Sequence, residues 1–555
     1  MIGVIASPAD HDVVREFFEL FKTPWELYRG DQRYDVVICA GEDQPVGNAR
    51  LVVFYGGRKI RFEDEQKAAV ANQQRCSCVL RYGENRIPIY GDALTFSDKA
   101  DGLLTVEGSQ ETAAYLDRAG GTHRARVGYD LFAEVRTLLT AGQPSENAGI
   151  PSLELHIAFL RDLITACGIS LIEIPPVPEG FRFIACLTHD VDHPSIRQHK
   201  WDHTIFGFLY RALFSSLHDV FRDRLSLRDA FKNWTAAVKL PFVYTGYVKD
   251  YWRDFDDRYL ELEKGLASTF FVIPYKNQPG ETSDGSAHGF RASGYEAKEL
   301  EGTIRKLMAA GCEVALHGID AWIDSSKGRA EIEEIRRLTG SSEIGVRMHW
   351  LYYNEKSPAV LEKAGAAYDS TVGYNETVGY RAGTTQVYKP LEPERLLELP
   401  MHVMDTALFY PSYLALSPKK ASAHLEQLMD NAAQFGGCLT INWHDRSLAP
   451  ERLWGDCYRE LIQDLKMRGA WFATASQATS WFRKRRSAAF ELHALEPVTV
   501  RAKVPADHGE ELPGLRLRIH KIQESHQAGS RHSETFVDRT LDEGVEAGVA
   551  SEARI

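Results

Sequence analysis

The sequence lacks the features that would place the protein in a membrane or on nucleic acid. No apolar run is long enough to span a bilayer, and the first residues, MIGVIASPADHD, contain no basic leader. The formal net charge is -12, whereas a nucleic-acid-binding domain usually carries a basic surface. We therefore expect a cytoplasmic protein that neither crosses a membrane nor binds nucleic acid.

Motifs of several common enzyme classes are also absent. The pair Gly56–Gly57 does not complete a G-x-G-x-x-G fingerprint, so no dinucleotide site is predicted. There is no G-x-S-x-G elbow and no cysteine nucleophile motif, which disfavours a serine or thiol hydrolase. Of the eight cysteines only Cys76 and Cys78 lie close together, and a lone C-x-C is no metal knuckle. We expect buried free thiols in a reducing compartment.

The order of apolar runs and polar segments predicts three domains. Residues 1–175 alternate strand and helix signals, which indicates a small α/β layer domain. Residues 176–486 repeat the strand–helix alternation many times and form the predicted main domain. Residues 487–555 contain short strand signals and an acidic polar tail, so a small β-rich appendage is expected there.

The main domain has the pattern of a β/α barrel. Near-continuous apolar strands that alternate with helices indicate a parallel sheet covered on both faces, and so many repeats favour a closed or partly closed barrel. The first interval is too long for one helix, so residues 197–267 are predicted to form a helical insertion. The apolar runs are Phe183–Leu187, Thr269–Ile273, Cys312–Leu316, Ile344–Val346, Ala367–Tyr368, Leu396–Leu399, Cys438–Trp443 and Ala470–Thr474.

One of these runs ends in closely spaced carboxylates. The sequence FRFIACLTHDVDHP is an apolar strand followed by Asp190 and Asp192. Side chains alternate along a strand, so the two carboxylates share one side and raise each other's pKa unless a cation or donor lies between them. A metal with a bound water would relieve this conflict, since one carboxylate can bind the metal while the other takes a proton from the water. A solvated D-x-D turn is the alternative reading.

Three further strands carry histidine or arginine at their carboxyl ends. The run CEVALHGID leads to His317, IGVRMHW places Arg347 and His349 two residues apart, and CLTINWHDR leads to His444. Each residue alone could be structural. The carboxyl ends of barrel strands carry the active site, however, so four such strands together favour one. Histidine and carboxylate suit a zinc-like divalent ion with an open position for water.

The ordered series resembles the catalytic domain of the polysaccharide deacetylases, carbohydrate esterase family four, between about residues 181 and 479. That family has a distorted (β/α) barrel and hydrolyses N- or O-acetyl groups of sugars. THDVD resembles its first motif, which implies that Asp190 is the catalytic base and Asp192 a metal ligand. LHG resembles the second motif and implies that His317 is a metal ligand.

The later motifs follow in the same order. GVRMH resembles the third motif and implies that Arg347 orients the base, while AYDSTVGY implies that Asp369 lies near that arginine and helps to hold Asp190. INWHD resembles the fifth motif more loosely and implies that His444 is the general acid. The resemblance thus predicts a hydrolase that binds a divalent metal ion, of which zinc is the expected one.

The second motif departs from the family pattern. The family has another histidine four residues after the first, and this chain has Ala321 there. Asp320 or His349 could complete the metal site, and we predict Asp192, His317 and His349 as its ligands.

Two other segments are candidates for contact with substrate. In YDSTVGYNETVGYRAGTT, which follows Asp369, the side chains of Tyr374, Tyr380 and Arg381 are predicted to bind sugar. His402 and Asp405 follow another strand, and a substrate contact and a structural role are equally open for both. The apolar helix TIFGFLYRALFSSL of the insertion either packs on the barrel or lies on a membrane surface; packing is favoured because acids dilute its basic character.

The sequence therefore predicts a metal-dependent hydrolase that removes acetyl groups from an N- or O-acetylated sugar or polysaccharide intermediate. Two alternatives stay open because of Ala321. One is a metal-free hydrolase of another C–N bond, as in the allantoinase-like branch. The other is a catalytically silent carbohydrate-binding subunit on the same fold. The oligomeric state and the sugar are not predicted.

Overall fold

A computed structural model describes most of the chain, and the chain forms two compact units. The central unit comprises Phe181–Arg381 and Thr385–Ser480; the terminal unit comprises Met1–Gly180, Ala382–Thr384 and Trp481–Ile555. The boundaries expected near residues 175 and 486 stay predictions. The described residues are 1–41, 49–60, 70–74, 78–97, 102–118, 121–200, 202–221, 226–493, 499–503, 512–520, 536–541 and 546–548.

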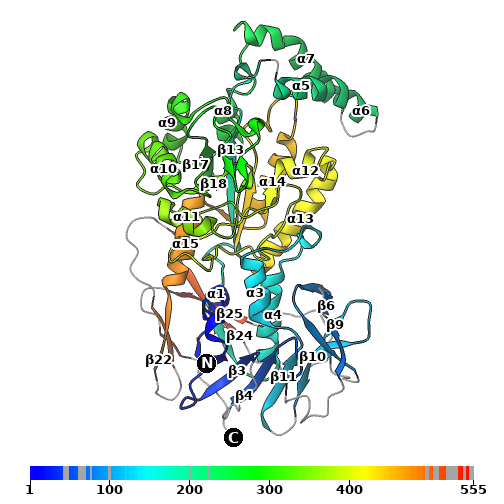
Figure 1. Cartoon of the computed structure of the whole chain (residues 1–555), viewed down its shortest axis with the longest axis vertical. Coiled ribbons are helices and arrows are strands. Elements are labelled where there is room, and N and C mark those ends of the chain that lie inside the picture. Colours follow the sequence, from blue (N-terminus) through cyan, green and yellow to red (C-terminus); the bar gives the residue numbers. More distant parts are fainter. Residues whose placement is uncertain are drawn as a thin grey trace. The chain divides into compact units, whose positions relative to one another are not determined.

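The central unit is built on a parallel sheet of seven strands (Figure 1). The strand order is β18-β17-β14-β13-β20-β19, and β21 also pairs with β13. Six of the strands are buried along almost their whole length, because helices cover both faces of a parallel sheet. The strands are β13 (Phe183–Val191), β14 (Ser268–Val272), β17 (Glu313–Gly318), β18 (Val346–Met348), β19 (Val403–Met404), β20 (Cys438–Asn442) and β21 (Ala470–Phe472).

Isolated bridges continue this sheet from β18 back to β19. Val346 of β18 pairs in parallel with Asp369, and Asp369 pairs in parallel with Glu398, in the segment that runs on into β19. Strand β19 pairs with β20, which pairs with β13. The hydrogen-bonded neighbours therefore follow one another round a ring, although the runs at Ala367–Tyr368 and Leu396–Leu399 contribute bridges instead of full strands.

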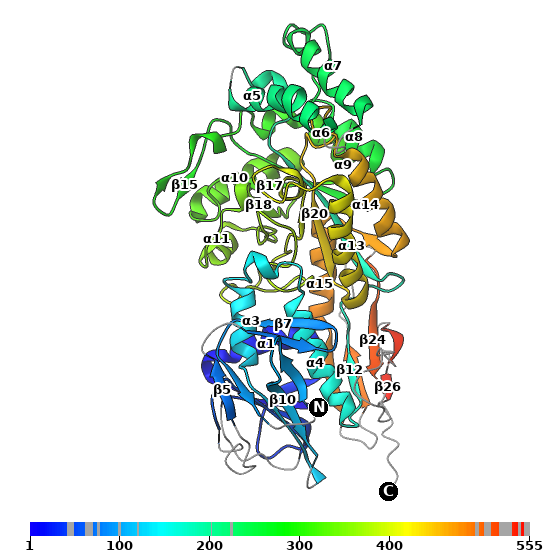
Figure 2. The ribbon, with the colours of Figure 1, turned by 90° about the vertical axis from the view of Figure 1, so that its right-hand side faces the viewer.

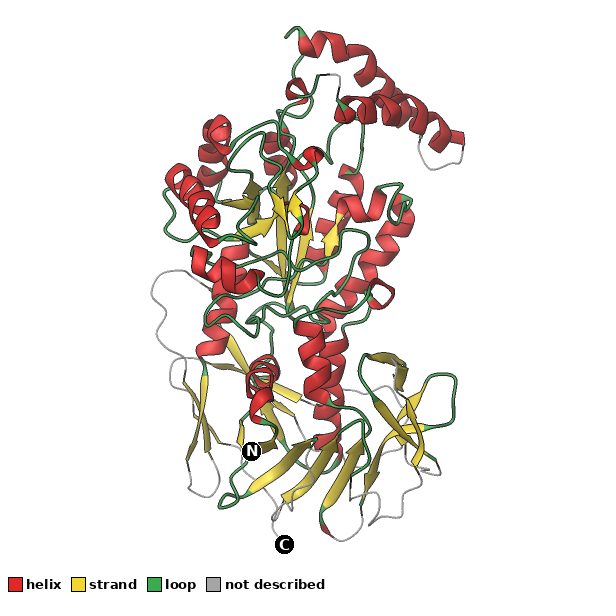
Figure 3. Ribbon diagram, in the orientation of Figure 1, coloured by secondary structure: helices red, strands yellow, loops and turns green. Residues whose placement is uncertain are grey.

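Helices surround this sheet, as the strands drawn inside the helices in Figure 3 show. Figure 2 gives the same arrangement from the side, with β17, β18 and β20 between α10 and α13. Most of these helices follow a strand in the chain, as expected of β/α repeats, whereas α8 follows the helices of the insertion and α13 follows α12. The helices are α8 (Phe255–Leu262), α9 (Glu301–Ala309), α10 (Ser325–Thr339), α11 (Ser357–Ala364), α12 (Asp405–Phe409), α13 (Pro418–Phe435), α14 (Gly455–Met467) and α15 (Ala475–Ser487), which runs on into the terminal unit.

The interval between β13 and β14 contains the helices expected of an insertion, at one end of the central unit (Figure 1). They are α5 (His203–Tyr210), a π-helical turn (Arg211–Ser215), α6 (Ser216–Phe221) and α7 (Leu227–Tyr244), followed by α8. Phe208 is fully buried, but Phe206, Phe214 and Phe221 are exposed by 54%, 65% and 85%. The helix therefore packs with only part of its apolar surface, and contact with a membrane surface stays a prediction.

The terminal unit contains a mixed sheet of eleven strands in the order β2-β1-β3-β4-β11-β10-β9-β6-β7, with β5 and β8 paired beside it. The pairs among β1–β4 and β11 are parallel and the remaining pairs are antiparallel. The strands are β1 (Ile2–Ile5), β2 (Trp25–Leu27), β3 (Tyr34–Ala40), β4 (Ala49–Tyr55), β5 (Val70–Gln74), β6 (Cys78–Tyr82), β7 (Asn85–Ile89), β8 (Ala93–Phe96), β9 (Gly102–Val106), β10 (Thr112–Asp117) and β11 (His123–Val127). Helices α1 (His11–Phe21), α3 (Leu131–Leu139) and α4 (Ser152–Ala166) complete this α/β part.

The strands expected as a C-terminal appendage pair within the same unit. β24 (Leu515–His520) lies between β12 (Leu171–Glu173) and β25 (Phe536–Leu541), because the free edge of β12 offers it a partner. β22 (Ala489–His493), β23 (Thr499–Lys503) and β26 (Glu546–Gly548) form a second small sheet. The rest of the predicted polar tail lies outside the described residues.

Two expectations about the whole chain can be compared with the described residues. The seven cysteines among them are free and buried, as predicted, and Cys76 lies outside them. Every helix in the described ranges is too short or too polar to cross a membrane.

Candidate active site

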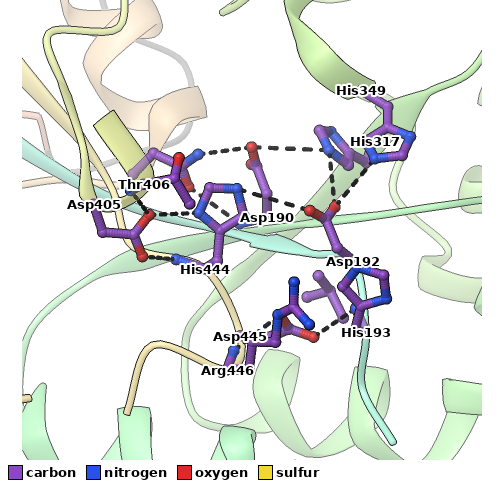
Figure 4. Close-up of polar contacts among 12 residues, drawn as sticks. Asp190, Asp192, His193, His317, His349, Asp405, Thr406, His444, Asp445 and Arg446 are labelled. Atoms are coloured by element: carbon purple, nitrogen blue, oxygen red, sulfur yellow. Dashed lines mark hydrogen bonds and ion pairs between the residues drawn. The ribbon is translucent and has the colours of Figure 1, made fainter. Parts of the chain in front are cut away.

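The site lies at the carboxyl edge of the parallel sheet (Figure 4). Asp190 is near the end of β13, His317 is near the end of β17, and Arg347 is in β18. Asp192, His349 and His444 follow the ends of β13, β18 and β20. The carboxyl ends of parallel strands meet at one edge, so the fold brings together residues that are up to about 250 positions apart in the chain, as the contact between Asn442 and Asp190 illustrates.

Asp192, His317 and His349 form a group that could hold a metal ion. One ligand atom from each lies within 4.8 Å of the other two. Asp192 Oδ1 is 3.4 Å from His317 Nε2 and 3.6 Å from His349 Nε2. The three predicted metal ligands are therefore close to one another.

The two imidazoles can present lone pairs to a cation. His317 Nδ1 is 3.0 Å from the carbonyl oxygen of Arg347, which can only accept, so Nδ1 carries the proton and Nε2 is free to bind a metal. Burial, together with the charges of His317 and Arg291, outweighs Asp192 and lowers the pKa of His349 to about 3. His349 is therefore a neutral imidazole, the form that binds metals.

The chemistry of this group fits a divalent cation. Asp192 Oδ1 is buried and has no hydrogen-bond partner among the described residues. Two imidazoles and one carboxylate are a common ligand set for zinc-like ions, with a further position for water. Asp320, the other candidate ligand, is committed elsewhere, since its oxygens accept from the backbone N–H of Glu281 at 2.7 Å and from Lys327 Nζ at 3.1 Å.

A buried arginine fixes the backbone that carries His349. Arg291 is 1% exposed and donates to the carbonyl oxygen of His349 from Nη2 at 3.0 Å and from Nε at 3.3 Å. The same side chain donates to the carbonyl oxygen of Ile319, two residues beyond His317, at 2.8 Å. Trp350 and Leu351 have φ values of 61° and 53°, which bulky residues rarely adopt. The turn after β18 is thus held in an uncommon conformation that aims His349 at Asp192.

Asp190 is held by two neighbours as a carboxylate. Its Oδ1 accepts from Arg347 Nη1 at 3.0 Å, and its Oδ2 accepts from Asn442 Nδ2 at 2.7 Å. Burial alone would raise the pKa of Asp190, but the charges of His317, Arg347 and His444 outweigh it and hold the pKa below its ordinary value. Asp190 is therefore ionised and oriented next to the Asp192 group.

Arg347 is itself completely fixed. The side chain is fully buried and lies 4.3 Å from the centroid of the Phe271 ring. Besides Asp190, its guanidinium donates to Thr188 Oγ1 at 2.7 Å, to Ser370 Oγ at 2.9 Å and to the Ser370 carbonyl oxygen at 3.1 Å. The predicted approach of Arg347 to Asp190 is present in the structure.

His444 faces Asp192 from the other side of the cavity. His444 Nε2 is 3.8 Å from Asp192 Oδ2, and its Nδ1 donates to Asp405 Oδ1 at 2.6 Å. Asp405 is fully buried, at the start of α12, and also accepts from the backbone N–H of His444 at 2.7 Å. Burial would lower the pKa of His444, but Asp405, Asp192 and Asp190 outweigh it and raise the pKa to about 10. The imidazole is therefore protonated near neutral pH.

Asp369 lies away from these groups. Among the described residues it makes neither a hydrogen bond nor an ion pair with Asp190 or Arg347. Its Oδ1 accepts from Thr371 Oγ1, and its electrostatic partner is the buried Glu398. Burial raises the pKa of Asp369 to about 6 and raises that of Glu398 as well. The structure thus places Asp369 in a separate carboxyl pair with Glu398.

A cavity of about 510 Å³ opens above these residues. Tyr374, Tyr380 and Arg381 are absent from the described residues that line it. Tyr380 is fully buried, with its ring 5.4 Å from that of His402, and Arg381 donates to the Gly373 carbonyl oxygen at 2.9 Å. The structure therefore does not bring the three predicted sugar-binding side chains to the site. The residues that line the cavity include Trp350, Asn375, Tyr410, Tyr413, Arg446 and Arg452.

Two residues of the site were not assigned from the sequence. Asn442 lies in the same run as His444, but a polar residue inside a strand gives no signal of its partner 252 positions away. Asp405 was noted only as a residue after a strand, together with His402. His402 accepts from the backbone N–H of Thr440 at 3.2 Å, a structural contact, whereas Asp405 orients His444.

Among the comparisons with known proteins, the one with solved structures finds chains that are similar to this one. No family model and no curated protein matches the chain. A Mycobacterium smegmatis structure that carries the name polysaccharide deacetylase is 21% identical, over 56% of this chain and 95% of that chain, with a TM-score of 0.34. A structure of the same name from Pseudomonas aeruginosa PAO1 is 15% identical, over 58% of this chain and 98% of that chain, with a TM-score of 0.32.

A GH57 branching enzyme from Thermococcus kodakaraensis also matches, at 11% identity over 54% of this chain and 71% of that chain, with a TM-score of 0.28. Structures named polysaccharide deacetylase are thus among those similar to this chain.

Proposed function

We propose that this chain is a metal-dependent hydrolase that removes acetyl groups from an N- or O-acetylated sugar or polysaccharide intermediate. One observation carries the proposal. A two-histidine, one-carboxylate group lies next to an ionised carboxylate, Asp190, 3.8 Å from His317, and a protonated imidazole, His444, 3.8 Å from Asp192, in one cavity. Metal-dependent acyl hydrolysis uses these parts together: a polarising cation, a base for water and an acid for the leaving group.

Asp192, His317 and His349 would hold the metal. A bound divalent ion would supply Lewis-acid polarisation of the acyl carbonyl and would make a neighbouring water more acidic. The hydrogen bond of His317 Nδ1 to the Arg347 carbonyl oxygen and the anchoring of His349 by Arg291 keep the ligand atoms pointed at one place.

Asp190 is the proposed base. It accepts the proton of the attacking water as the water oxygen bonds to the acyl carbon. Arg347 and Asn442 each occupy one of its oxygens with a single donor, and this fixes the plane of the carboxylate while lone pairs are left for the proton.

His444 is the proposed acid. When the bond from the acyl carbon to the sugar nitrogen or oxygen breaks, His444 Nε2 gives its proton to that atom. The hydrogen bond of Nδ1 to Asp405 fixes the tautomer and stabilises the imidazolium before the transfer. Acetate and the deacetylated sugar are the products.

The test is release of acetate from acetylated sugars by the metal-loaded protein. Asp190→Asn keeps the shape of the side chain but removes the base, so turnover should fall by about 10² to 10⁴-fold. Asp456→Asn is the matched control, because Asp456 is 80% exposed and lies outside the cavity lining. Turnover equal to that of wild type in Asp190→Asn would overturn the assignment.

The two alternatives give different results in the same assay. A metal-free C–N hydrolase would keep its activity after chelation and would cleave a substrate other than an acetylated sugar. A silent carbohydrate-binding subunit would bind sugar without turnover in wild type and in Asp190→Asn alike.

A further inference from the structure

Three arginines form one wall of the cavity on the side of His444. Arg211 comes from the π-helical turn of the insertion, Arg446 is two residues beyond His444, and Arg452 lies in the same loop as Arg446, between β20 and α14. We call Arg211, Arg446 and Arg452 the arginine wall. Arg452 Nη1 donates to Ser447 Oγ at 3.4 Å, and that hydroxyl in turn donates to Asp405, so the wall lies next to the proposed acid.

The arginine wall has buried N–H donors without partners. Arg211 Nε, Arg446 Nη1 and Arg452 Nε are buried and make no hydrogen bond to any described residue. None of the three guanidiniums forms an ion pair with a carboxylate of the described residues. A buried charged donor without an acceptor is costly, so such donors are expected to meet an ordered water or a ligand.

Nearby carboxylates do not neutralise this wall. Asp445 accepts from the backbone N–H of His193 at 2.9 Å and from that of Arg446 at 2.9 Å. Glu451 accepts from Trp252 Nε1 at 2.9 Å, and its second oxygen, although unpartnered, lies beyond ion-pair distance of the three guanidiniums. Asp405 is engaged by His444 and Ser447.

The wall produces a positive potential in the cavity. Burial would raise the pKa of Tyr410, yet the charges of Arg452, Arg446 and Arg211 hold it below its ordinary value. Burial, followed by repulsion from Arg452 and Arg446, lowers the pKa of Arg211 to about 10. Three cations that repel one another in a low-dielectric wall are stabilised by an anion placed between them.

We propose that the substrate carries an anionic group, a phosphate or a carboxylate, beside its acetylated sugar, and that the arginine wall binds this group. Guanidinium donors match the oxygens of both anions, and Arg is the side chain best suited to hold them. The inference rests on the proposed function and adds to it a substrate class. The inference also gives the helical insertion a role, because the insertion carries Arg211, one of the residues that would bind the anionic group.

The experiment compares three acetylated sugars with the metal-loaded wild type. N-acetylglucosamine is neutral, its 1-phosphate carries a phosphate, and the corresponding N-acetylated uronic acid carries a carboxylate. We expect kcat/KM to be at least about tenfold higher for one of the charged sugars, since hydrogen bonds between charged groups are the strong ones. The charged sugar that is preferred identifies the group.

Arg446→Gln and Arg211→Gln should remove most of this preference by raising KM for the charged sugar only. Arg446→Lys keeps the charge without the planar fork of donors and should retain part of the preference for the charged sugar. Arg305→Gln is the matched control, since Arg305 is 72% exposed on α9. Equal kcat/KM for neutral and charged sugars in wild type would overturn the inference, and so would an unchanged preference in the folded Gln variants.

Binding separates this inference from the proposed function. If wild type hydrolyses none of the sugars, calorimetry with inorganic phosphate and with N-acetylglucosamine 1-phosphate still tests the wall. Binding that weakens at least about tenfold in Arg446→Gln supports an anion site, whatever the reaction. If wild type hydrolyses none of the sugars, absence of binding of both probes and of the N-acetylated uronic acid to wild type overturns it.

Discussion

His444 Nδ1 lies 2.6 Å from Asp405 Oδ1, and Asp405 Oδ2 accepts the backbone N–H of the same histidine at 2.7 Å. One buried carboxylate therefore fixes both the ring and the backbone of the proposed acid. This relationship makes Asp405 a positioning residue, since it acts on the reaction through His444.

Replacing Asp405 should weaken the acid and shift its pH dependence. In wild type the pKa of His444 is raised to about 10, so the protonated form persists through neutral pH. Asp405→Asn removes the main charge that raises this pKa, so the protonated form is lost at lower pH and turnover falls as pH rises through the new value. We expect kcat to fall by about tenfold to a hundredfold, less than the ~10² to 10⁴-fold expected for loss of the acid itself.

The pH profile of kcat distinguishes this role from a structural one. A purely structural Asp405 would lower kcat at all pH values without moving the alkaline limb. An alkaline limb that stays where wild type has it would contradict the assignment.

Replacing Asn442 should impair the action of Asp190 as the base and leave metal binding unchanged. Asn442→Ala removes the donor that holds Asp190 Oδ2 at 2.7 Å and leaves Asp192, His317 and His349 in place. We expect kcat to fall by about tenfold, in the range of one lost hydrogen bond to a charged group, with KM and bound metal unchanged. Steady-state kinetics and elemental analysis of one preparation test this. Loss of metal in the variant would count against it.

Replacing Arg291 should weaken metal binding more than it affects Asp190, the proposed base. Arg291→Met releases the carbonyl oxygens of His349 and Ile319, and these fix the segments that carry the two histidine ligands. We expect metal affinity to fall by about 10- to 100-fold, as for other residues that orient ligands. A titration with cobalt, followed by absorption, measures it. Arg305→Met is the matched control, and equal affinities in the two variants would contradict the prediction.

The Asp369 and Glu398 pair should affect stability more than activity. Burial raises both pKa values, so the folded state binds more protons than the unfolded state once pH exceeds the ordinary values near 4. The free energy of unfolding should therefore fall as pH rises from about 4 through about 6 in wild type. Glu398→Gln removes one titrating partner and should flatten this slope while kcat stays close to wild type.

Denaturant unfolding at several pH values measures that slope. The sequence predicted instead that Asp369 helps to hold Asp190. A loss of kcat in Glu398→Gln comparable to that in Asp190→Asn, with an unchanged pH slope of stability, would favour the sequence prediction over the contacts in the structure.

The sequence predicted those parts of the site that depend on local patterns. An apolar strand followed by a polar side chain locates the carboxyl end of a strand, and Asp190, His317 and His444 were found in this way. Several of the predicted strand runs coincide with strands of the structure, as in Phe183–Leu187, which lies within β13, and Cys438–Trp443, which contains β20. In a parallel sheet the carboxyl ends of the strands lie at one edge, so the proximity of these residues follows from the fold class.

The parts that the sequence does not determine depend on contacts between distant segments. Tyr380 and Arg381 were expected at the cavity because they follow Asp369, but the chain turns there so that Tyr380 packs on His402. The arginine wall combines the insertion with the loop after β20, and no spacing in the sequence indicates that meeting. The choice between Asp320 and His349 as ligand likewise depended on where Lys327 and Glu281 lie.

Metal content tests the central claim most directly. The protein is loaded with zinc, dialysed, and analysed for metal per chain in wild type, His349→Ala and Asp320→Asn. We expect about one ion per chain in wild type and in Asp320→Asn, and loss of that ion in His349→Ala, because His349 is one of the three proposed protein ligands. No ion in wild type, or an ion retained in His349→Ala and lost in Asp320→Asn, would contradict the account.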